Sequence, residues 1–343
     1  MTGMDSSEAL RVLVVDDQAS ARETVTDRLE VVSEDTGLSF DPDCYDSFEA
    51  AAAASRSREF DLAIVDLRDG QSDHIPGNDR GLQLFGTMKS WGFVPTVFYT
   101  AYASDIGAEL RDLRFVRVVP KEHTEQLDVA VRDLIESGAV TAARDVKGAV
   151  RDELRNFMWS QADRPSDETP EDLRSQVFRR AAARLDRLAP EGATGAGPSR
   201  MYLVPPMSQD PECGAVLRDR DDEWWVVATP ACDLVMRGGK RKAGFIRLLR
   251  AKPLEEMGIK HRNDVATGSK PRFFHLAAHG PIPELVVDLQ HVRSEPCEWW
   301  SSTARGTIEA TLDAPFAEAL LVRYGQYAGR VGTPTLDKDR LGN

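Results

Sequence analysis

The stretch Asp61-Leu62-Ala63-Ile64-Val65-Asp66-Leu67 decides how the first part of this chain folds. Its apolar residues 62–65 form an unbroken run that ends at the carboxylate of Asp66, and polar, Gly-containing sequence follows. A short unbroken apolar run is typical of a strand buried on both faces of a parallel sheet. Open α/β sheets hold their functional side chains at the C-terminal ends of such strands. We therefore expect Asp66 to lie at a functional sheet edge.

Strand-like and helix-like segments alternate on both sides of this stretch. We expect further strands over residues 11–15, 40–45, 96–100 and 115–119. We expect helices over residues 19–32, 47–57, 81–91, 106–113 and 125–135. This alternation predicts an α/β fold with a doubly wound parallel sheet of about five strands, in a first domain over residues 1–137.

Polar side chains stand at the C-terminal ends of the predicted strands, and they are Asp16, Asp17, Asp66, Thr100 and Lys121. The carboxyl ends of parallel strands meet at one sheet edge, so we expect these side chains to converge. Three crowded carboxylates repel one another and require a hard cation, and oxygen-only ligands suit Mg²⁺. Lys121 can pair with a carboxylate or a phosphoryl oxygen, and the Thr100 hydroxyl can donate to another. The set predicts Asp66 as a nucleophile toward phosphorus, with Mg²⁺ spreading the transition-state charge.

The motifs VVDD at residues 14–17, IVDL at 64–67 and YTAY at 99–102, together with Lys121, resemble the receiver domain of two-component response regulators. The resemblance covers about residues 10–137 and implies a flavodoxin-like fold. It implies that Asp66 accepts a phosphoryl group from a histidine kinase, and that Thr100 and Lys121 contact the phosphate. It also implies that Asp16, Asp17 and the backbone carbonyl of Arg68 complete the metal site with Asp66.

Two features depart from the receiver pattern. Residues 68–80 separate the phosphoacceptor strand from Gly81 by an insertion of several residues, which could cover the site, form a docking surface or be a tolerated insertion. The family's Lys-Pro order is inverted at Pro120-Lys121, and Val118 replaces an aromatic residue three positions before the lysine. The family's switching mechanism therefore does not transfer, although Tyr99 and Tyr102 could substitute for the missing aromatic residue.

A helical connector is expected over residues 138–198. Two amphipathic helices, over 142–158 and 173–188, are separated by a break at Pro165 to Pro170, and a Pro-, Gly- and Ala-rich linker follows. The helices could pack on a neighbouring domain, form a dimerisation hairpin that makes a homodimer, or form a helix-turn-helix. The connector is only mildly basic and has no short Gly turn, so DNA reading is the least favoured interpretation.

The third part, residues 199–343, contains short predicted strands separated by polar turns, followed by a helix over 314–327. This pattern favours a small β-rich barrel or sandwich. The sequence TPACDL at 229–234 loosely resembles the SH3-like barrel modules of receiver-linked proteins from bacterial antiviral defence loci. That resemblance implies a protein-interaction domain and a role in antiviral defence.

A catalytic alternative for the third part rests on Cys232. With His275, His279 or His291 it could form a thiol–imidazole pair or a zinc site. Cys232 follows an apolar strand, and a buried, unreactive cysteine is the more common case. His275 and His279 lie in a strand-like context without a neighbouring acid, so we expect ordinary histidines.

Composition and charge exclude several classes of protein. The 343 residues are 41% hydrophobic and 29% charged, as in a globular protein. No window approaches the roughly 18 apolar residues of a membrane span. The N-terminus is acidic, so we do not expect it to be a secretory signal. The four scattered cysteines fit a reducing cytoplasm, so we expect a cytoplasmic protein. Residues 1–137 hold 27 acidic against 13 basic residues, which argues against nucleic-acid binding there. Nine Lys or Arg between Arg237 and Arg262 form either a solvated face or a surface for an acidic partner.

Three functions remain open from the sequence. The first is a response regulator, or a phosphate sink, with a protein partner for the third part. The second is a receiver-gated Cys/His hydrolase. The third is a transcription regulator that acts through the connector helices.

Overall fold

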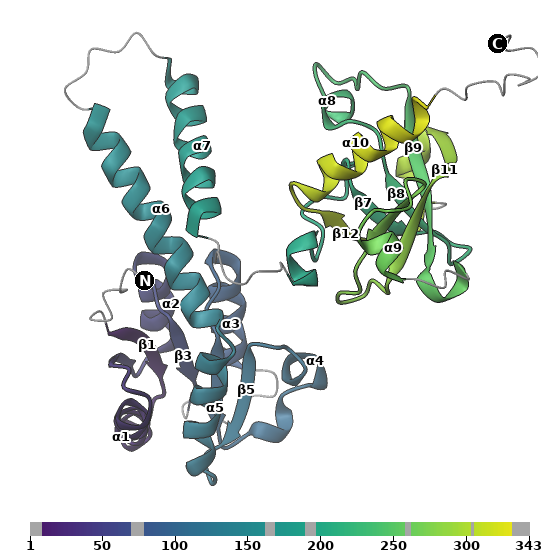
Figure 1. The fold of residues 1–343 in the computed structure, drawn as a ribbon. Coiled ribbons are helices and arrows are strands. Elements are labelled where there is room, and N and C mark those ends of the chain that lie inside the picture. The colour runs from purple at the N-terminus through teal and green to yellow at the C-terminus, as the bar shows by residue number, and fades with distance from the viewer. Residues whose placement is uncertain are drawn as a thin grey trace, which may run out of the picture. The chain divides into compact units, whose positions relative to one another are not determined.

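The computed structural model describes residues 9–69, 79–161, 169–188, 197–257, 262–302 and 305–330. The chain separates into two compact units, residues 1–190 and 191–343, which are both visible in Figure 1. Among the described helices, none combines the length and apolar composition that crossing a bilayer requires.

The first unit begins with an alternating α/β arrangement. Its strands are β1 (Leu10–Val15), β2 (Phe40–Tyr45), β3 (Leu62–Val65), β4 (Thr96–Thr100) and β5 (Val116–Pro120). Its helices are α1 (Ala19–Thr36), α2 (Phe48–Ser57), α3 (Arg80–Trp91), the short α4 (Ala108–Arg111) and α5 (Glu125–Glu136), with a 3-10 turn at Ala103–Asp105. All strand pairs are parallel and the order is β2-β1-β3-β4-β5. This is the flavodoxin-like order, so the predicted five-stranded doubly wound sheet is confirmed.

The central strand β3 is buried at all four of its positions, as its sequence predicts. Leu62 and Ile64 pack on one face of the sheet with residues of α1 and α5. Ala63 and Val65 pack on the other face with residues of α2 and α3. The side chains of a strand alternate between the two faces, so an unbroken apolar run is required when helices cover both.

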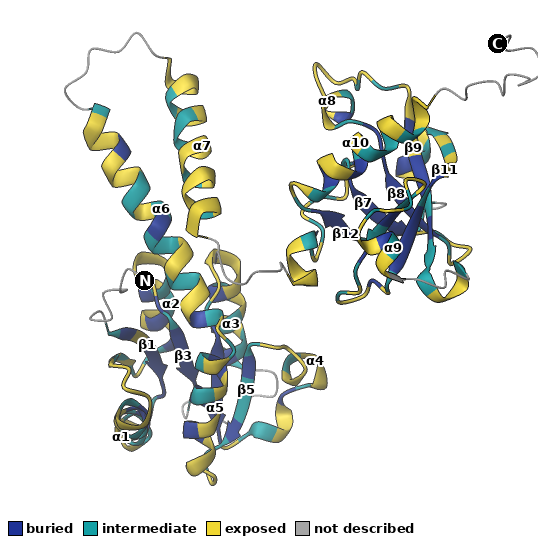
Figure 2. Cartoon of the chain, viewed as in Figure 1, coloured by how far each residue is buried: buried dark blue, intermediate teal, exposed yellow. Residues whose placement is uncertain are grey.

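Two long helices, α6 (Ala139–Gln161) and α7 (Pro170–Leu188), follow α5 and lie side by side as a hairpin (Figure 1). Thr169 begins α7: its hydroxyl accepts from the backbone N–H of Asp172, and the Asp172 carboxylate accepts from the Thr169 N–H in return. Arg180 of α7 pairs with Glu153 of α6 at 2.6 Å. No residue of α7 is buried, and Figure 2 shows that exposed positions run along the hairpin.

The second unit is an antiparallel sheet with one well-formed helix. Its strands are β6 (Tyr202–Leu203), β7 (Ala215–Arg218), β8 (Trp224–Val227), β9 (Phe245–Pro253), β10 (Phe273–Leu276), β11 (Leu285–Pro296) and β12 (Thr307–Leu312). Its α-helices are α8 (Ala231–Leu234), α9 (Arg262–Ala266) and α10 (Phe316–Ala328), and 3-10 turns lie at Pro198–Met201, Leu254–Met257 and Cys297–Ser301.

The strand order in this second sheet is β10-β11-β9-β8-β7-β12-β6, and neighbouring strands are antiparallel. The sheet curls as a half-barrel, and α10 packs on one face through Ala317 and Leu320. The β-rich prediction with a C-terminal helix is therefore confirmed at this level, and the SH3-like assignment stays a prediction.

Candidate metal-binding and phosphoacceptor site

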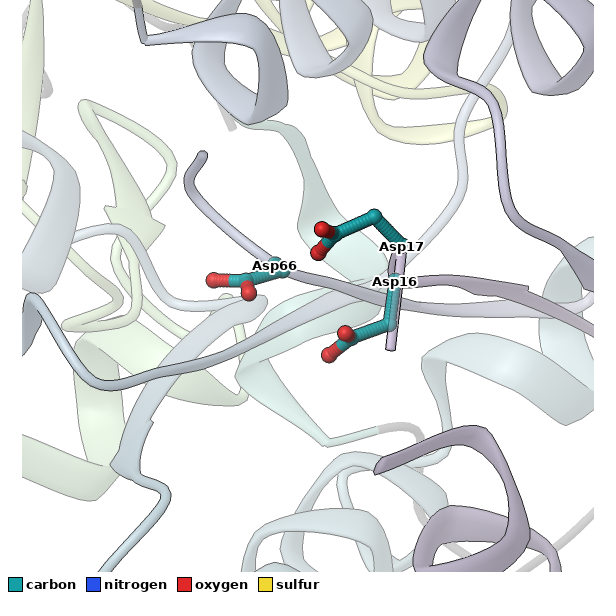
Figure 3. A group of neighbouring side chains, drawn as sticks. All are labelled: Asp16, Asp17 and Asp66. Atoms are coloured by element: carbon teal, nitrogen blue, oxygen red, sulfur yellow. The ribbon is translucent and has the colours of Figure 1, made fainter. Parts of the chain in front are cut away.

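The ends of β1 and β3 bring the predicted carboxylates together. Val15 of β1 pairs with Val65 of β3, and the N–H of Asp66 donates to the Val15 carbonyl at 2.8 Å. One carboxylate oxygen from each of Asp16, Asp17 and Asp66 lies within 4.8 Å of the others. Figure 3 shows the three side chains extending from neighbouring strand ends toward the same space. The convergence expected from the strand ends is therefore present.

Lys121 lies between two of these carboxylates. Its Nζ is 2.7 Å from Asp16 Oδ2 and 2.6 Å from Asp66 Oδ2. Strand order explains the contact, because β5 ends beside β4, which ends beside β3, so Lys121 emerges at the same sheet edge. The ammonium compensates negative charge that would otherwise be largely buried, since Asp16 is 2% and Asp66 6% exposed.

The local environment shifts the protonation of this cluster. Burial, reinforced by the charge of Asp66, raises the pKa of Asp16 above its ordinary value, although Lys121 and the Gln18 N–H act in the opposite direction. Burial by itself would lower the pKa of Lys121, but its hydrogen bonds to Asp16 and Asp66 outweigh burial and raise it. Lys121 therefore stays an ammonium ion across the physiological range.

The oxygens of Asp66 have defined partners. Oδ1 accepts a hydrogen bond from the Leu67 N–H at 2.6 Å, and Oδ2 accepts one from Lys121. Asp16 is held in a similar way, because its Oδ1 accepts from the Gln18 N–H at 3.0 Å. These bonds orient both carboxylates without a bound ligand, which reduces the reorganisation that binding of an ion would require.

Thr100 lies at the same edge, at the end of β4. It is fully buried, its carbonyl accepts from the Lys121 N–H at 3.0 Å, and its hydroxyl oxygen accepts from the Tyr102 N–H at 3.2 Å. The Tyr102 bond fixes the position of the hydroxyl oxygen and does not use its proton, which can donate to a further acceptor. No direct contact joins Thr100 to Asp66 among the described residues.

The Arg68 side chain forms a clamp that the sequence analysis missed. Its guanidinium pairs with Asp105 at 2.6 Å, lies 3.6 Å from Asp79, and sits 4.3 Å from the ring centre of Tyr102. The side chain thus ties the end of β3 to the start of α3 and to the segment after β4. No local pattern could reveal the pairing, because Asp105 is 37 positions away. The predicted role of the Arg68 carbonyl as a metal ligand stays a prediction.

The suggested aromatic substitutes have different environments. Tyr99 is 4% exposed and its hydroxyl lies 3.0 Å from that of Thr124, so it is a core residue rather than a movable switch. Tyr102 is half-buried beneath Arg68. The interpretation of segment 68–80 as a cover or docking surface falls mostly on residues 70–78, which lie outside the described residues.

Gly81 is required by the close approach of α3 to the backbone of Asp66 and Leu67. A Cβ at this position would collide with the carbonyl oxygen of Asp66 and lie 2.9 Å from the Cα of Leu67. Backbone atoms of a buried strand end cannot move aside cheaply. We expect Gly81→Ala to lower the free energy of unfolding by about 1–3 kcal/mol, the usual cost of overpacking.

Urea unfolding followed by circular dichroism measures the effect of Gly81→Ala. The matched control is Gly86→Ala in the same helix, where a Cβ meets nothing within 4 Å and the change is expected to be neutral or stabilising. Equal stability of the two variants would contradict the packing argument.

The donor set fits Mg²⁺. Three carboxylates supply hard oxygen ligands, and the described residues contain no other group of three or more His, Cys, Asp or Glu close enough to share an ion. Binding to the folded state alone would stabilise it. At a Mg²⁺ concentration ten times the dissociation constant, the gain is expected to be about 1.4 kcal/mol.

Thermal unfolding with and without MgCl₂, at ionic strength matched with NaCl, measures this gain as a Tm increase of roughly 3–5 °C. Asp17→Asn is expected to remove the increase, and Asp27→Asn, a change at an exposed position of α1, is expected to keep it. An increase that survives Asp17→Asn would place the ion elsewhere.

The catalytic alternative in the second unit finds little support. Cys232 is exposed at the start of α8, so the expectation of a buried Cys232 is wrong; its thiol lies 3.7 Å from Asp233 Oδ1. His275 pairs with Glu284 at 2.7 Å, His279 stacks on Tyr202, and His291 meets the ring of Trp225. No contact joins Cys232 to any of these histidines in the described part of the chain. The thiol–imidazole pair and the zinc site therefore lack the required geometry.

The basic run of the second unit is partly neutralised by acids from outside it. Arg241 pairs with Asp210 at 3.2 Å, Lys242 pairs with Asp233 at 3.0 Å, and Arg250 pairs with Glu223. Arg237 and Lys240 lie exposed in a turn. Part of the run is therefore a salt-bridged surface rather than a continuous basic patch.

The chain matches no protein-family model and no curated protein. Solved structures are similar to part of it. The response regulator receiver domain (CheY-like) from Methylobacillus flagellatus is 22% identical, and the match covers 37% of this chain and 99% of that one, with a TM-score of 0.30. The response regulator protein TrrA from Thermotoga maritima, in complex with Mg²⁺ and BeF, is 26% identical over 36% of this chain and 98% of that one, with a TM-score of 0.28.

The response regulator domain of Thermotoga maritima CheB is 15% identical over 38% of this chain and 97% of that one, with a TM-score of 0.30. The matches span whole receiver-sized chains and little more than a third of the present one. The strand order identifies the fold of the first unit, and the contacts among the three carboxylates and Lys121 identify the candidate site.

Proposed function

We propose that the protein is a response regulator that accepts a phosphoryl group on Asp66 from a histidine kinase. The observation that carries the proposal is the cluster itself, in which Asp16, Asp17 and Asp66 lie within 4.8 Å and Lys121 contacts two of them. A nucleophilic carboxylate beside two metal-binding carboxylates and a fixed cation is the constellation that phosphoryl transfer to aspartate requires.

The residues divide the chemistry among them. An Asp66 oxygen attacks phosphorus, so that a P–O bond forms as the P–N bond to the kinase imidazole breaks. Asp16, Asp17 and Asp66 would hold Mg²⁺, which would supply charge neutralisation for the transferring group. Lys121 then moves its contact from the Asp66 carboxylate to a phosphoryl oxygen, and the Thr100 hydroxyl donates to another. Both donors stand at the ends of neighbouring strands, since Thr100 ends β4 and Lys121 follows β5.

We further propose that the second unit binds a protein partner. Val235 and Met236, which follow α8, and Phe245, the first residue of β9, are 52%, 51% and 63% exposed. Exposed apolar side chains within one short stretch of the chain, which also carries the exposed Arg237 and Lys240, suit a protein contact better than solvent. The role in antiviral defence stays a prediction that rests on the TPACDL resemblance alone.

Intact-mass measurement over time, after addition of acetyl phosphate and Mg²⁺, tests the proposal. The expected result is a mass increase of one phosphoryl group that requires Mg²⁺. A long-lived adduct would indicate a switch, and rapid turnover with consumption of acetyl phosphate would indicate a phosphate sink. If neither acetyl phosphate nor a phosphorylated histidine kinase labels the protein, the proposal is wrong.

A further inference from the structure

Three large, exposed apolar side chains of the α6–α7 hairpin lie on the same one of its two sides. Leu154 and Met158 of α6 are 44% and 43% exposed, and Phe178 of α7 is 62% exposed. A solvated helix pair has no reason to present large apolar side chains to water, and grouped exposed apolar residues mark interaction surfaces. The hairpin contains no histidine, so it cannot be a phosphohistidine carrier.

Helix geometry places Leu154, Met158 and Phe178 on the same side of the hairpin. Glu153 and Phe157 of α6 contact Arg180 of α7 and so define the seam between the helices. Leu154 and Met158 each follow one of these seam residues by one position, which is a rotation of about 100° around α6.

On α7, Phe178 and Ala182 likewise follow Val177 and Ala181, which are less exposed than they are. Equal rotations on two antiparallel helices turn both sets toward the same side of the pair. We call the surface made by Leu154, Met158, Phe178 and Ala182 the hairpin face.

We propose that the hairpin face binds the same face of a second copy of this chain, so that two hairpins form a four-helix bundle. A two-fold axis parallel to the helices sets α6 of one copy against α7 of the other and makes the surface self-complementary. In the register set by the Glu153–Arg180 pair, Phe178 on α7 lies level with the Leu154–Met158 stretch of α6, and small Ala182 lets the helices approach closely.

Charge at the margin of the hairpin face favours this pairing. Arg151 lies one turn before Leu154 on α6, and Asp186 lies one turn after Ala182 on α7. Neither has an ion-pair partner within the described part of the chain. Since the Glu153–Arg180 pair sets the register, Arg151 and Asp186 lie about 6 Å apart along the bundle axis, within reach of an arginine side chain. The two-fold arrangement therefore brings Arg151 to the partner's Asp186, whereas α6-on-α6 packing would set Arg151 against the partner's α6, away from Asp186 on α7.

Sedimentation velocity of the full chain, without phosphodonor, tests the proposal separately from phosphotransfer. The wild type is expected to be dimeric at micromolar concentration. Met158→Glu and Phe178→Glu are each expected to raise the dissociation constant at least about tenfold, because each puts a carboxylate into the centre of the interface. Met158→Gln and Phe178→Ala, which disturb the helices less, are expected to act in the same direction.

Trp159→Glu is the matched control. Trp159 is the neighbour of Met158 and is 75% exposed, but its position turns it away from the hairpin face. Dimerisation is expected to survive this change. A wild type that stays monomeric at about 100 μM, or a Trp159→Glu variant as weakened as Met158→Glu, would overturn the proposal.

A charge exchange tests the arrangement of the two copies. Arg151→Asp and Asp186→Arg are each expected to weaken the dimer, and the double variant is expected to restore it, because the exchanged charges again pair across the interface. Failure of the double variant to recover would overturn the two-fold arrangement.

Discussion

Replacing Asp66 with Asn is expected to slow phosphoryl uptake from acetyl phosphate by a factor on the order of 10³ or more. The amide keeps the size of the side chain but is a poor nucleophile toward phosphorus. Lys121 keeps its contact with Asp16, so the fold should survive the change. Intact mass after incubation with acetyl phosphate and Mg²⁺ measures the loss.

Asp61→Asn is the matched control for this experiment. Asp61 precedes the same strand at its other end, where its carboxylate accepts from the Arg11 N–H at 3.0 Å. We expect this variant to take up phosphate at the wild-type rate. If Asp66→Asn formed the phosphoryl adduct in undiminished yield, the acceptor would be another residue and the assignment of Asp66 as acceptor would be wrong.

Replacing Lys121 with Met is expected to lower the free energy of unfolding of the first unit by about 3–5 kcal/mol in Mg²⁺-free buffer at neutral pH. The side chains of Asp16 and Asp66 are 3% and 7% exposed and would face each other without their shared cation. Removing one partner of a buried charge group leaves an uncompensated charge, which costs far more than loss of a surface pair. Urea titration with hydrogen-exchange mass spectrometry on β1 and β3 peptides measures the stability of this unit alone.

The loss of stability in the Lys121→Met variant is expected to depend on pH in a definite direction. Burial raises the pKa of Asp16 in the folded state above its unfolded-state pKa of 3.8. Protonation of Asp16 therefore stabilises the folded state at pH values below 3.8. This contribution to the free energy of unfolding is lost as the pH rises through the folded-state pKa. Loss of Lys121 removes contributions that lower this pKa. The deficit of the variant should therefore shrink on acidification from neutral pH.

Lys147→Met is the control, because Lys147 is 38% exposed and lies 3.8 Å from Glu59. Its expected cost is at most about 1 kcal/mol, as for exposed ion pairs. Equal losses in the two lysine variants, or a deficit in Lys121→Met that grows on acidification, would contradict the buried-cluster argument.

Much of the candidate site could be predicted because its residues lie at the C-terminal ends of strands. Leu62 to Val65 is apolar at every position because helices cover both faces of the sheet, so the local sequence predicts the burial of the strand. The acid that ends such a strand must lie at the sheet edge. Local patterns could not show which side chain pairs with which, as the Arg68–Asp105 clamp demonstrates.

The second unit was less predictable for a physical reason. Its short strands are recognisable, but the order β10-β11-β9-β8-β7-β12-β6 depends on pairings between segments far apart in the chain, such as β12 with β6. Alternating patterns tell which face of a strand is buried and do not identify its neighbour. The exposure of Cys232 follows from that arrangement, and its sequence context suggested the opposite.

The sequence by itself determined the α/β character of the first unit, the placement of Asp16, Asp17, Asp66, Thr100 and Lys121 at strand ends, and the two connector helices. These depend on spacing within a few residues, which local backbone and burial preferences control. Only the tertiary structure decided that Lys121 bridges Asp16 and Asp66, 105 and 55 positions away, and that the hairpin leaves one apolar face uncovered. Such contacts depend on strand order and on what covers each helix, because they form between segments whose separation along the chain carries no local signal.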